Sequence, residues 1–278
     1  MEWKNIFRGM LMGISDVIPG VSGGTIAFIL GIYDRLIEAI SGIFSRDWLK
    51  HLKFLIPLGI GIVGALLIFS HLLDYLLHTY PQPTMFLFLG LIIGVLPLLA
   101  KESNMLQTFN AQHYFALLLS LVLVGSMAFL QESTRPVIET LTVGSAISLF
   151  FAGWIASMTM LLPGISGSMV LLILGFYTTA IAALKDINIP IILTIGAGVA
   201  VGFIISSKLI KYVLEHFPKI TFAAIIGLVM GSTLIVFPGF SQSMLANVIS
   251  IITFIIGLIV VQFIARTNEK MVAKRETE

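Results

Sequence analysis

Cysteine is absent from the 278-residue chain, and charged residues are scarce. Without cysteine the protein has no disulfide, no thiol catalyst and no cysteine-based metal site. Only 11% of the residues are charged, whereas soluble domains carry roughly a quarter. The 16 Lys and Arg residues form no basic face of the kind that nucleic-acid binding requires. These absences argue against a water-soluble protein and against nucleic acid as a partner.

Hydrophobic residues make up 58% of the chain and are concentrated in long runs. A helix needs about 20 apolar residues to cross the ~30 Å hydrocarbon layer, whereas a barrel strand needs about ten with alternating polarity. The runs have the length of helices, so the sequence predicts an all-α polytopic membrane protein. Six runs are expected to span the membrane: Phe54–Leu77, Met85–Ala100, Tyr114–Leu130, Ile189–Ser206, Phe222–Phe237 and Val248–Ala265.

The two halves of the chain repeat each other. Positions 19–33, PGVSGGTIAFILGIY, and 163–177, PGISGSMVLLILGFY, are 144 residues apart and identical at eight of fifteen positions. Ordered self-similarity of this kind predicts an internal duplication, with repeat 1 at residues 1–140 and repeat 2 at 141–278. A second block repeats at an offset of 137, and its first copy consists of Gly59, Gly61, Ser70, Tyr75, Pro81, Thr84, Gly90 and Gly94.

Each half is expected to contain a re-entrant helical hairpin followed by three spans. The hairpins, at about residues 3–44 and 141–184, turn at Pro-Gly-x-Ser-Gly tips. The arms of the first are too short and polar to cross alone, since Lys4, Arg8 and Asp16 lie in its leading arm. For the second hairpin, length alone also allows two full spans. With three spans, each half crosses the membrane an odd number of times, so the second half starts on the opposite side from the first. We therefore predict inverted repeats whose tips approach each other near the midplane.

The positions of the cations favour this topology. Cytoplasmic loops are enriched in Lys and Arg, and if both hairpins return to the side they entered, 14 of the 16 cations face the cytoplasm. Only Arg135 and Lys185 lie outside. If each hairpin were one broken crossing, only ten cations would face the cytoplasm. We therefore predict a multi-pass inner (plasma) membrane protein with both termini in the cytoplasm, and we expect no removable signal peptide.

The tips carry the features of an anion site. A helix start offers unpaired N–H groups and a positive dipole end, and glycine lets an anion approach the backbone. Close packing of small residues is the alternative for a single copy, but two facing copies favour binding. Arg135 and Lys185, which flank the second hairpin, are candidates for attracting an anionic headgroup, with chance interfacial charges as the alternative. The tip candidates are Ser22, Gly23, Gly24, Thr25, Ser166, Gly167 and Ser168.

Asp16 lies three residues before the first Pro-Gly turn, about 5 Å from it at 1.5 Å per helical residue. A carboxylate near the midplane is costly and usually functional. Asp16 is therefore a candidate for proton coupling or gating, with helix capping as the alternative. Its counterpart in repeat 2 is Met160. Arg35 and Glu38, by contrast, are expected to form a pair at the membrane surface.

An intramembrane serine hydrolase is a further hypothesis, because Gly-x-Ser-Gly also resembles the nucleophile segment of such enzymes. Catalysis would need a base beside the serine, but the five histidines mostly fall at predicted span ends. No P-loop motif for ATP is present either. The sequence therefore predicts a transporter rather than an enzyme, with no metal and no cofactor, driven by a gradient or by mass action.

Both tip sequences, together with Gly13-Ile14-Ser15-Asp16 before the first, resemble the bacterial and archaeal polyprenyl-phosphate transporter family over essentially the whole chain. The resemblance implies a flippase that returns undecaprenyl phosphate from the outer to the cytoplasmic leaflet for cell-wall and surface-polysaccharide synthesis. It implies a polyprenyl phosphate and membrane lipids as partners. The coupling ion and the oligomeric state stay open. A carrier or channel for a small soluble anion is the second hypothesis for function.

Overall fold

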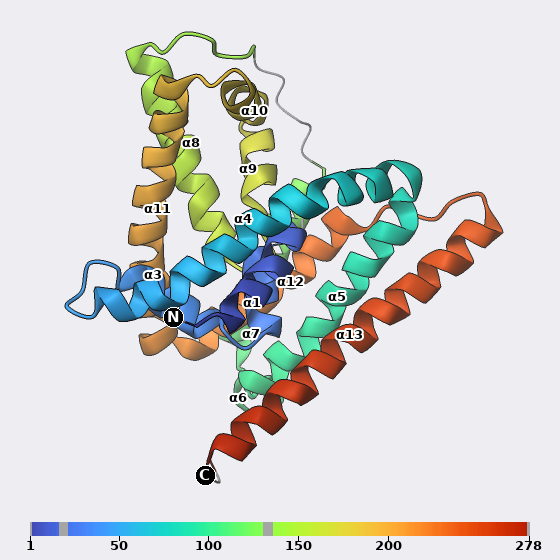
Figure 1. Ribbon diagram of the computed structural model, residues 1–278. Coiled ribbons are helices and arrows are strands. Elements are labelled where there is room, and N and C mark those ends of the chain that lie inside the picture. The colour runs from blue at the N-terminus through green and yellow to red at the C-terminus, as the bar shows by residue number, and fades with distance from the viewer. Residues whose placement is uncertain (1, 17–21, 130–135, 277–278) are drawn as a thin grey trace.

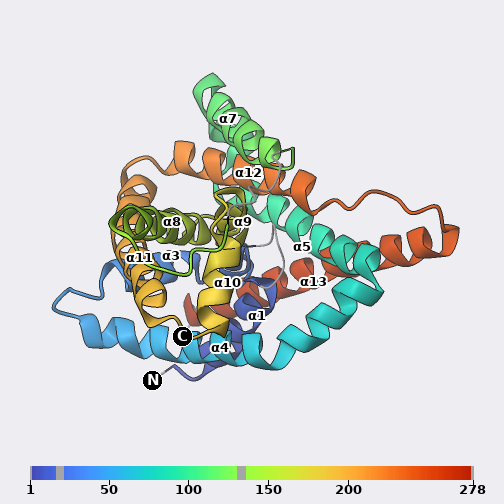
Figure 2. The ribbon, with the colours of Figure 1, turned by 90° about the horizontal axis from the view of Figure 1, so that it is seen from above.

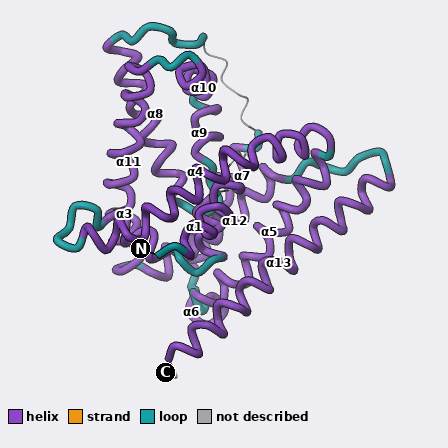
Figure 3. Tube along the Cα trace, viewed as in Figure 1, coloured by secondary structure: helices purple, strands orange, loops and turns teal. Residues whose placement is uncertain are grey.

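A computed structural model describes residues 2–16, 22–129 and 136–276 (Figure 1). Within these ranges the chain forms thirteen α-helices joined by loops and turns, and no strand is present (Figure 3). The prediction of an all-α protein is confirmed. The shorter helices are α1 (Lys4–Asp16), α2 (Gly23–Ile29), α3 (Tyr33–Ser41), α6 (Met105–Thr108), α7 (Ala111–Met127), α9 (Gly167–Ile173) and α10 (Tyr177–Lys185).

Six of the described helices are long and apolar enough to cross a membrane. The shortest has 19 residues, which at 1.5 Å per residue is close to the thickness of the hydrocarbon layer. The protein is therefore a multi-pass membrane protein, as predicted. The six helices are α4 (Trp48–Thr79), α5 (Pro81–Glu102), α8 (Val143–Leu161), α11 (Ile189–His216), α12 (Pro218–Val236) and α13 (Met244–Glu276).

Five of these helices contain a predicted span, and α8 is the exception. The remaining predicted span, Tyr114–Leu130, corresponds to α7, an apolar helix of 17 residues. Helix α8 is the leading arm of the second hairpin, whose length alone allowed a crossing. The returning arm is broken, since α9 and α10 are bent by 113°. A bend of this size is compatible with the predicted re-entrant hairpin.

The helices pack as two bundles and a group of four helices that we call the scaffold (Figures 1 and 2). The first bundle contains α1 to α4, with α1 packed closely along α4. The second contains α8 to α11, with α8 packed along α11. In the scaffold, α5 packs on α13, α7 packs on α12, and α5 meets α12. In the closest of these pairs, equivalent helices of the two halves have equivalent partners, in agreement with the duplication in the sequence.

Each of the four closest helix pairs is in contact at a glycine. A side chain at Gly61 would collide with a carbonyl oxygen of α1, and one at Gly198, its repeat equivalent, with a carbonyl oxygen of α8. Gly90 and Gly227, another repeated pair, meet carbonyl oxygens of α13 and α7 in the same way. Lipid does not drive helices together as water does, so close backbone approach at small residues supplies the attraction. The repeated glycines therefore position the long helices.

The corner between α4 and α5 is reproduced between α11 and α12. Thr84 donates its hydroxyl to the carbonyl oxygen of Tyr80 at 2.7 Å, and its equivalent Thr221 donates to that of Phe217 at 2.8 Å. The backbone angles φ and ψ are −131° and 55° at Tyr80 and −131° and 51° at Phe217. The repeated sequence thus forms the same local structure twice.

Gly31 and Gly175 break the returning arm of each hairpin. Both have a positive φ, 63° and 77°, which L side chains adopt only with strain. The next residue, Ile32 or Phe176, donates its N–H to the carbonyl oxygen five residues earlier, at 2.9 Å in both cases. This bond is one of the two that close a helix end in the Schellman motif. The motif separates α2 from α3 and α9 from α10.

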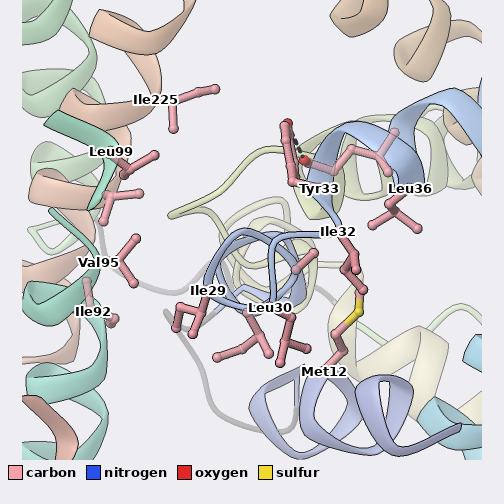
Figure 4. Close-up of a cluster of buried hydrophobic side chains, with 14 of the residues drawn as sticks. Met12, Ile29, Leu30, Ile32, Tyr33, Leu36, Ile92, Val95, Leu99 and Ile225 are labelled. Atoms are coloured by element: carbon pink, nitrogen blue, oxygen red, sulfur yellow. Dashed lines mark hydrogen bonds between the residues drawn. The ribbon is translucent and has the colours of Figure 1, made fainter. Parts of the chain in front are cut away.

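The largest apolar core surrounds α2 and α3. Met12 of α1, Ile29 of α2, Leu36 of α3 and Val95 of α5 are among its buried members (Figure 4). All residues of α2 except Phe28 are buried. The returning arm of the first hairpin therefore lies inside the protein.

We predict that Gly61→Leu destabilises the protein and that Gly59→Leu does not. Gly59 lies two residues away on the same helix and has open space where a side chain would go. Overpacking at Gly61 should cost about 1–3 kcal/mol, because two backbones must separate. The melting temperature of the purified protein in detergent measures the difference. Equal melting temperatures would show that the α1–α4 contact tolerates a side chain there.

Candidate functional site

The start of α2 lies directly against the tip of the second hairpin. Ser22, the residue before α2, accepts a hydrogen bond from the N–H of Gly24 at 3.2 Å and donates one to the carbonyl oxygen of Leu162 at 3.1 Å. Thr25 accepts a bond from the N–H of Gly164 at 3.0 Å. The two hairpins, far apart in the sequence, are thereby joined by side-chain hydroxyls.

Tyr33, at the start of α3, adds a third bond between the hairpins. Its hydroxyl donates to the carbonyl oxygen of Leu161 at 3.0 Å, and its side chain is 3% exposed. The last carbonyl groups of a helix have no partner within it, and at the end of α8 Tyr33 supplies one. Sequence reasoning missed this residue, although the repetition of Tyr33 as Tyr177 was a signal that could have found it.

The second tip is held between α2 and α12. Gly164 has a positive φ of 93°, and a side chain there would press on the backbone of Leu228 in α12. On the other side, Gly24 lies close enough that a side chain would contact Leu161 and Pro163. Gly23 is also buried. The glycines at the tips therefore allow close packing, the alternative that the sequence left open.

The start of α9 differs from the start of α2. The hydroxyls of Ser166 and Ser168 hydrogen-bond to each other at 2.8 Å, and Ser166 makes no capping bond to the backbone. Ser166 is buried, whereas Ser168 is partly exposed. A side chain at Gly167 would collide with Met160 of α8, so α9 approaches α8 closely there.

The geometry limits which groups are free to bind a ligand. Ser22 and Thr25 already bond to the second tip. Within the described residues, Ser166 and Ser168 bond only to each other through their hydroxyls, and the first N–H groups of α9 lack a side-chain cap. Hydroxyl and N–H donors at a helix start suit an anion. This second start is therefore the better candidate for the anion site.

Several predicted site residues lie outside the part that the structure describes. Asp16 is the last residue of α1, immediately before the first tip, but its side chain is not described. The same holds for the side chain of Lys185, the last residue of α10. Arg135 falls in the segment 130–135 and the first Pro-Gly turn in the segment 17–21, both outside the described residues.

The predicted surface pair between Arg35 and Glu38 is wrong. Arg35 forms its ion pair with Glu2, and its guanidinium lies 4.9 Å from the centre of the Phe54 ring. The N–H of Glu2 donates to the carbonyl oxygen of Lys53, which brings the start of the chain to α4 and α3. Spacing along one helix could not reveal a partner that arrives from another segment.

The tip serines bond to no base within the described residues. The Ser22 and Ser166 hydroxyls hydrogen-bond to Gly24, Leu162 and Ser168, none of which supplies a base. No group of three or more His, Asp or Glu side chains that could hold a metal ion occurs within the described ranges. The described part of the site consists of hydroxyl and backbone groups, which suit an anionic ligand.

Comparison with known proteins identifies the family of the chain. The family model described as VCA0040-like, undecaprenyl phosphate translocase-like, matches residues 12–250, which include both hairpin tips. The chain belongs to this family. It is 45% identical over 267 residues to a polyprenyl-phosphate transporter of Staphylococcus aureus, covering 93% of this chain and 94% of that protein. No solved structure matches the chain significantly.

A second relative agrees with the first. A polyprenyl-phosphate transporter of Vibrio cholerae is 34% identical over 238 residues, which cover 81% of this chain and 74% of that protein. The resemblance inferred from the two tips is therefore confirmed. The family also fits the prediction of a transporter rather than an enzyme.

We predict that Tyr33→Phe destabilises the protein by about 1 kcal/mol, because it leaves the buried carbonyl of Leu161 without its hydroxyl partner. Tyr177→Phe is the matched control. Tyr177 is the repeat equivalent, and its hydroxyl has no hydrogen bond within the described residues. Thermal unfolding in detergent compares the two variants. A loss of the same size in both would mean that the Tyr33 bond between the hairpins contributes nothing.

Proposed function

We propose that this protein moves a polyprenyl phosphate across the membrane, from the outer to the cytoplasmic leaflet. The observation that carries the proposal is 45% identity, over 93% of the chain, to a protein named polyprenyl-phosphate transporter. The six apolar helices suit such a substrate, since a lipid with a polyprenyl tail resides in the membrane. Net movement inward would return the lipid for reuse in cell-wall synthesis.

In this proposal the phosphate binds between the hairpin tips. A phosphate crossing hydrocarbon alone would lose its hydration without replacement, at a high cost in free energy. Hydroxyl and N–H donors at the tips replace part of that hydration while the tail stays in lipid. Ser166, Gly167 and Ser168 supply the donors, and Ser22, Gly23, Gly24 and Thr25 hold the opposite wall in place.

The orientation follows from the cations. With both hairpins re-entrant, 14 of 16 Lys and Arg residues face the cytoplasm, as do both termini. Repeat 2 then enters from the outside and is inverted relative to repeat 1, the usual construction of alternating-access transporters. Arg135 and Lys185 remain on the outer side, where they would attract an anionic headgroup. We place the protein in the inner membrane.

A carrier for a small soluble anion is the second candidate, because hydroxyl and N–H donors bind any anion of suitable size. The polyprenyl tail distinguishes the two functions. A lipid flippase acts on a substrate held in the membrane, whereas a soluble-anion carrier moves inorganic phosphate into the vesicle lumen. The same vesicles can therefore be tested with polyprenyl phosphate and with inorganic phosphate.

We predict that proteoliposomes will protect externally added polyprenyl phosphate from an impermeant phosphatase. The double variant Ser166→Ala, Ser168→Ala should slow this protection roughly 100- to 10,000-fold, because two charged hydrogen bonds are lost and each contributes about 1.5–3 kcal/mol. Ser148→Ala is the matched control, since that exposed hydroxyl bonds only to the carbonyl of Gly144 in its own helix. Uptake of inorganic phosphate without lipid protection would overturn the flippase in favour of the soluble-anion carrier.

We further propose that Asp16 couples transport to protons. In vesicles with an imposed pH gradient, Asp16→Asn should abolish the dependence of transport on the gradient, because the amide cannot titrate. Asparagine keeps the size and hydrogen bonding of the side chain, so some substrate binding should persist. Gradient dependence that survives in Asp16→Asn would exclude Asp16 as the proton carrier, and loss of binding alone would assign it to the organisation of the tip.

A further inference from the structure

The two hairpins are alike in sequence but lie in different surroundings. Helix α3 packs against α11, at the end of α11 opposite to α10 (Figure 1). The duplication predicts an equivalent contact between α10 and α4. No comparable packing joins α10 to α4 among the described residues. The difference therefore lies in how the hairpins are placed and not in how they are built.

Identical side chains show the difference most clearly. Ile37 of α3 is 1% exposed, whereas Ile181, the same position in α10, is 48% exposed. Tyr33 is buried and its equivalent Tyr177 is partly exposed. In this structure the first hairpin therefore makes a packing contact at this position that the second hairpin does not make.

The residue types of the last part of α11 recur at the equivalent positions of α4. Leu214 of α11 packs against the core that contains Ile37, as does its equivalent Leu77 of α4, and Ser207 of α11 is fully buried. The three repeated pairs are Ser70 with Ser207, Tyr75 with Tyr212, and Leu77 with Leu214.

Helix α3 lies between the tips and a polar cavity. At its first residue Tyr33 bonds to the second tip, and near its end Glu38 lines the cavity. His51 of α4 and Lys208 and Lys211 of α11 line the cavity from the other sides. Helix α3 therefore connects the second tip to the wall of this cavity, which lies on the side that we assign to the cytoplasm.

We infer that α3 and α10 are the two gates of the transporter, closed alternately. In this structure the α3 gate is closed on α11 and the α10 gate is open. In the second state α10 packs on the outer end of α4 while α3 leaves α11. Because the two gates close through equivalent residues, the packing given up at one is regained at the other, and the two states can lie close in free energy. This inference rests on the proposed function for its substrate and for the side of each gate.

Cysteine cross-linking tests the gates, and the chain has no native cysteine to remove. The inner pair is Ile37→Cys with Leu214→Cys, and the outer pair is the repeat equivalent, Ile181→Cys with Leu77→Cys. A short bifunctional thiol reagent should link the inner pair readily and stop lipid protection in proteoliposomes. A cleavable linker should restore transport on reduction. Transport that continues at the unmodified rate with the inner pair fully linked would overturn the inference.

The outer pair tests the second state directly. It should cross-link slowly in the resting protein, faster when polyprenyl phosphate is supplied, and not at all after the inner pair has been linked. The matched control is Gln82→Cys with Asn247→Cys, which joins α5 to α13 within the scaffold, where the native side chains hydrogen-bond at 2.8 Å. Linking this pair should leave transport intact. Outer-pair linking that is unaffected by a linked inner pair would contradict alternation.

Failure of the inference and failure of the proposed function give different results. If the reduced protein does not protect polyprenyl phosphate, the proposed function fails, whatever the cross-links do. If it protects the lipid but the inner and outer pairs link independently of each other, the function stands and the gates are wrong. Mutually exclusive linking without lipid protection would keep the gates and require another substrate.

Discussion

Close contact between helix backbones at glycine is the constraint on which the rest of the structure depends. In a membrane, apolar side chains gain little by leaving lipid for protein, so helices associate where their backbones can approach. Gly61 and Gly198 serve this purpose in the two bundles, and Gly90 and Gly227 in the scaffold. Because these positions are repeated, the two halves assemble by the same contacts. The hairpins are then carried by bundles of equal construction.

The hairpins use hydroxyl groups where a helix end leaves backbone groups without partners. Ser22, Thr25 and Tyr33 bond to the backbone of residues 161–164, so the first hairpin completes the second. Such bonds are favourable because unsatisfied backbone groups are costly away from water. The other helix start, at Ser166, keeps its donors available. Of the two similar tips, the first thus holds the hairpins together, and the second has donors that suit a ligand.

Under the proposed gating, the duplication explains how a protein with similar halves would face one side at a time. The local structure is the same in both copies, as the corners at Thr84 and Thr221 and the turns at Gly31 and Gly175 demonstrate. Only the docking of the hairpins differs. Helix packing has discrete arrangements, because side chains either interdigitate or do not. The proposed gates use this property, since the two hairpins would exchange their docked and undocked arrangements.

The sequence by itself determined the class of the protein, its helices and its family. Apolar run lengths depend only on membrane thickness, and five of the six predicted spans lie in helices of spanning length. Motif spacing was sufficient to locate the helices that start at Gly23 and Gly167. These features are local, and local features can be read from neighbouring residues.

Only the tertiary structure decided which tip groups are already bonded, that Arg35 pairs with Glu2, and that Ile37 is buried while Ile181 is exposed. Each of these depends on a partner from a distant segment. The two hairpins have nearly the same local sequence, so no local pattern could predict their different docking. The physical reason is that docking reflects the relative position of whole helix bundles, which the sequence of one hairpin does not encode.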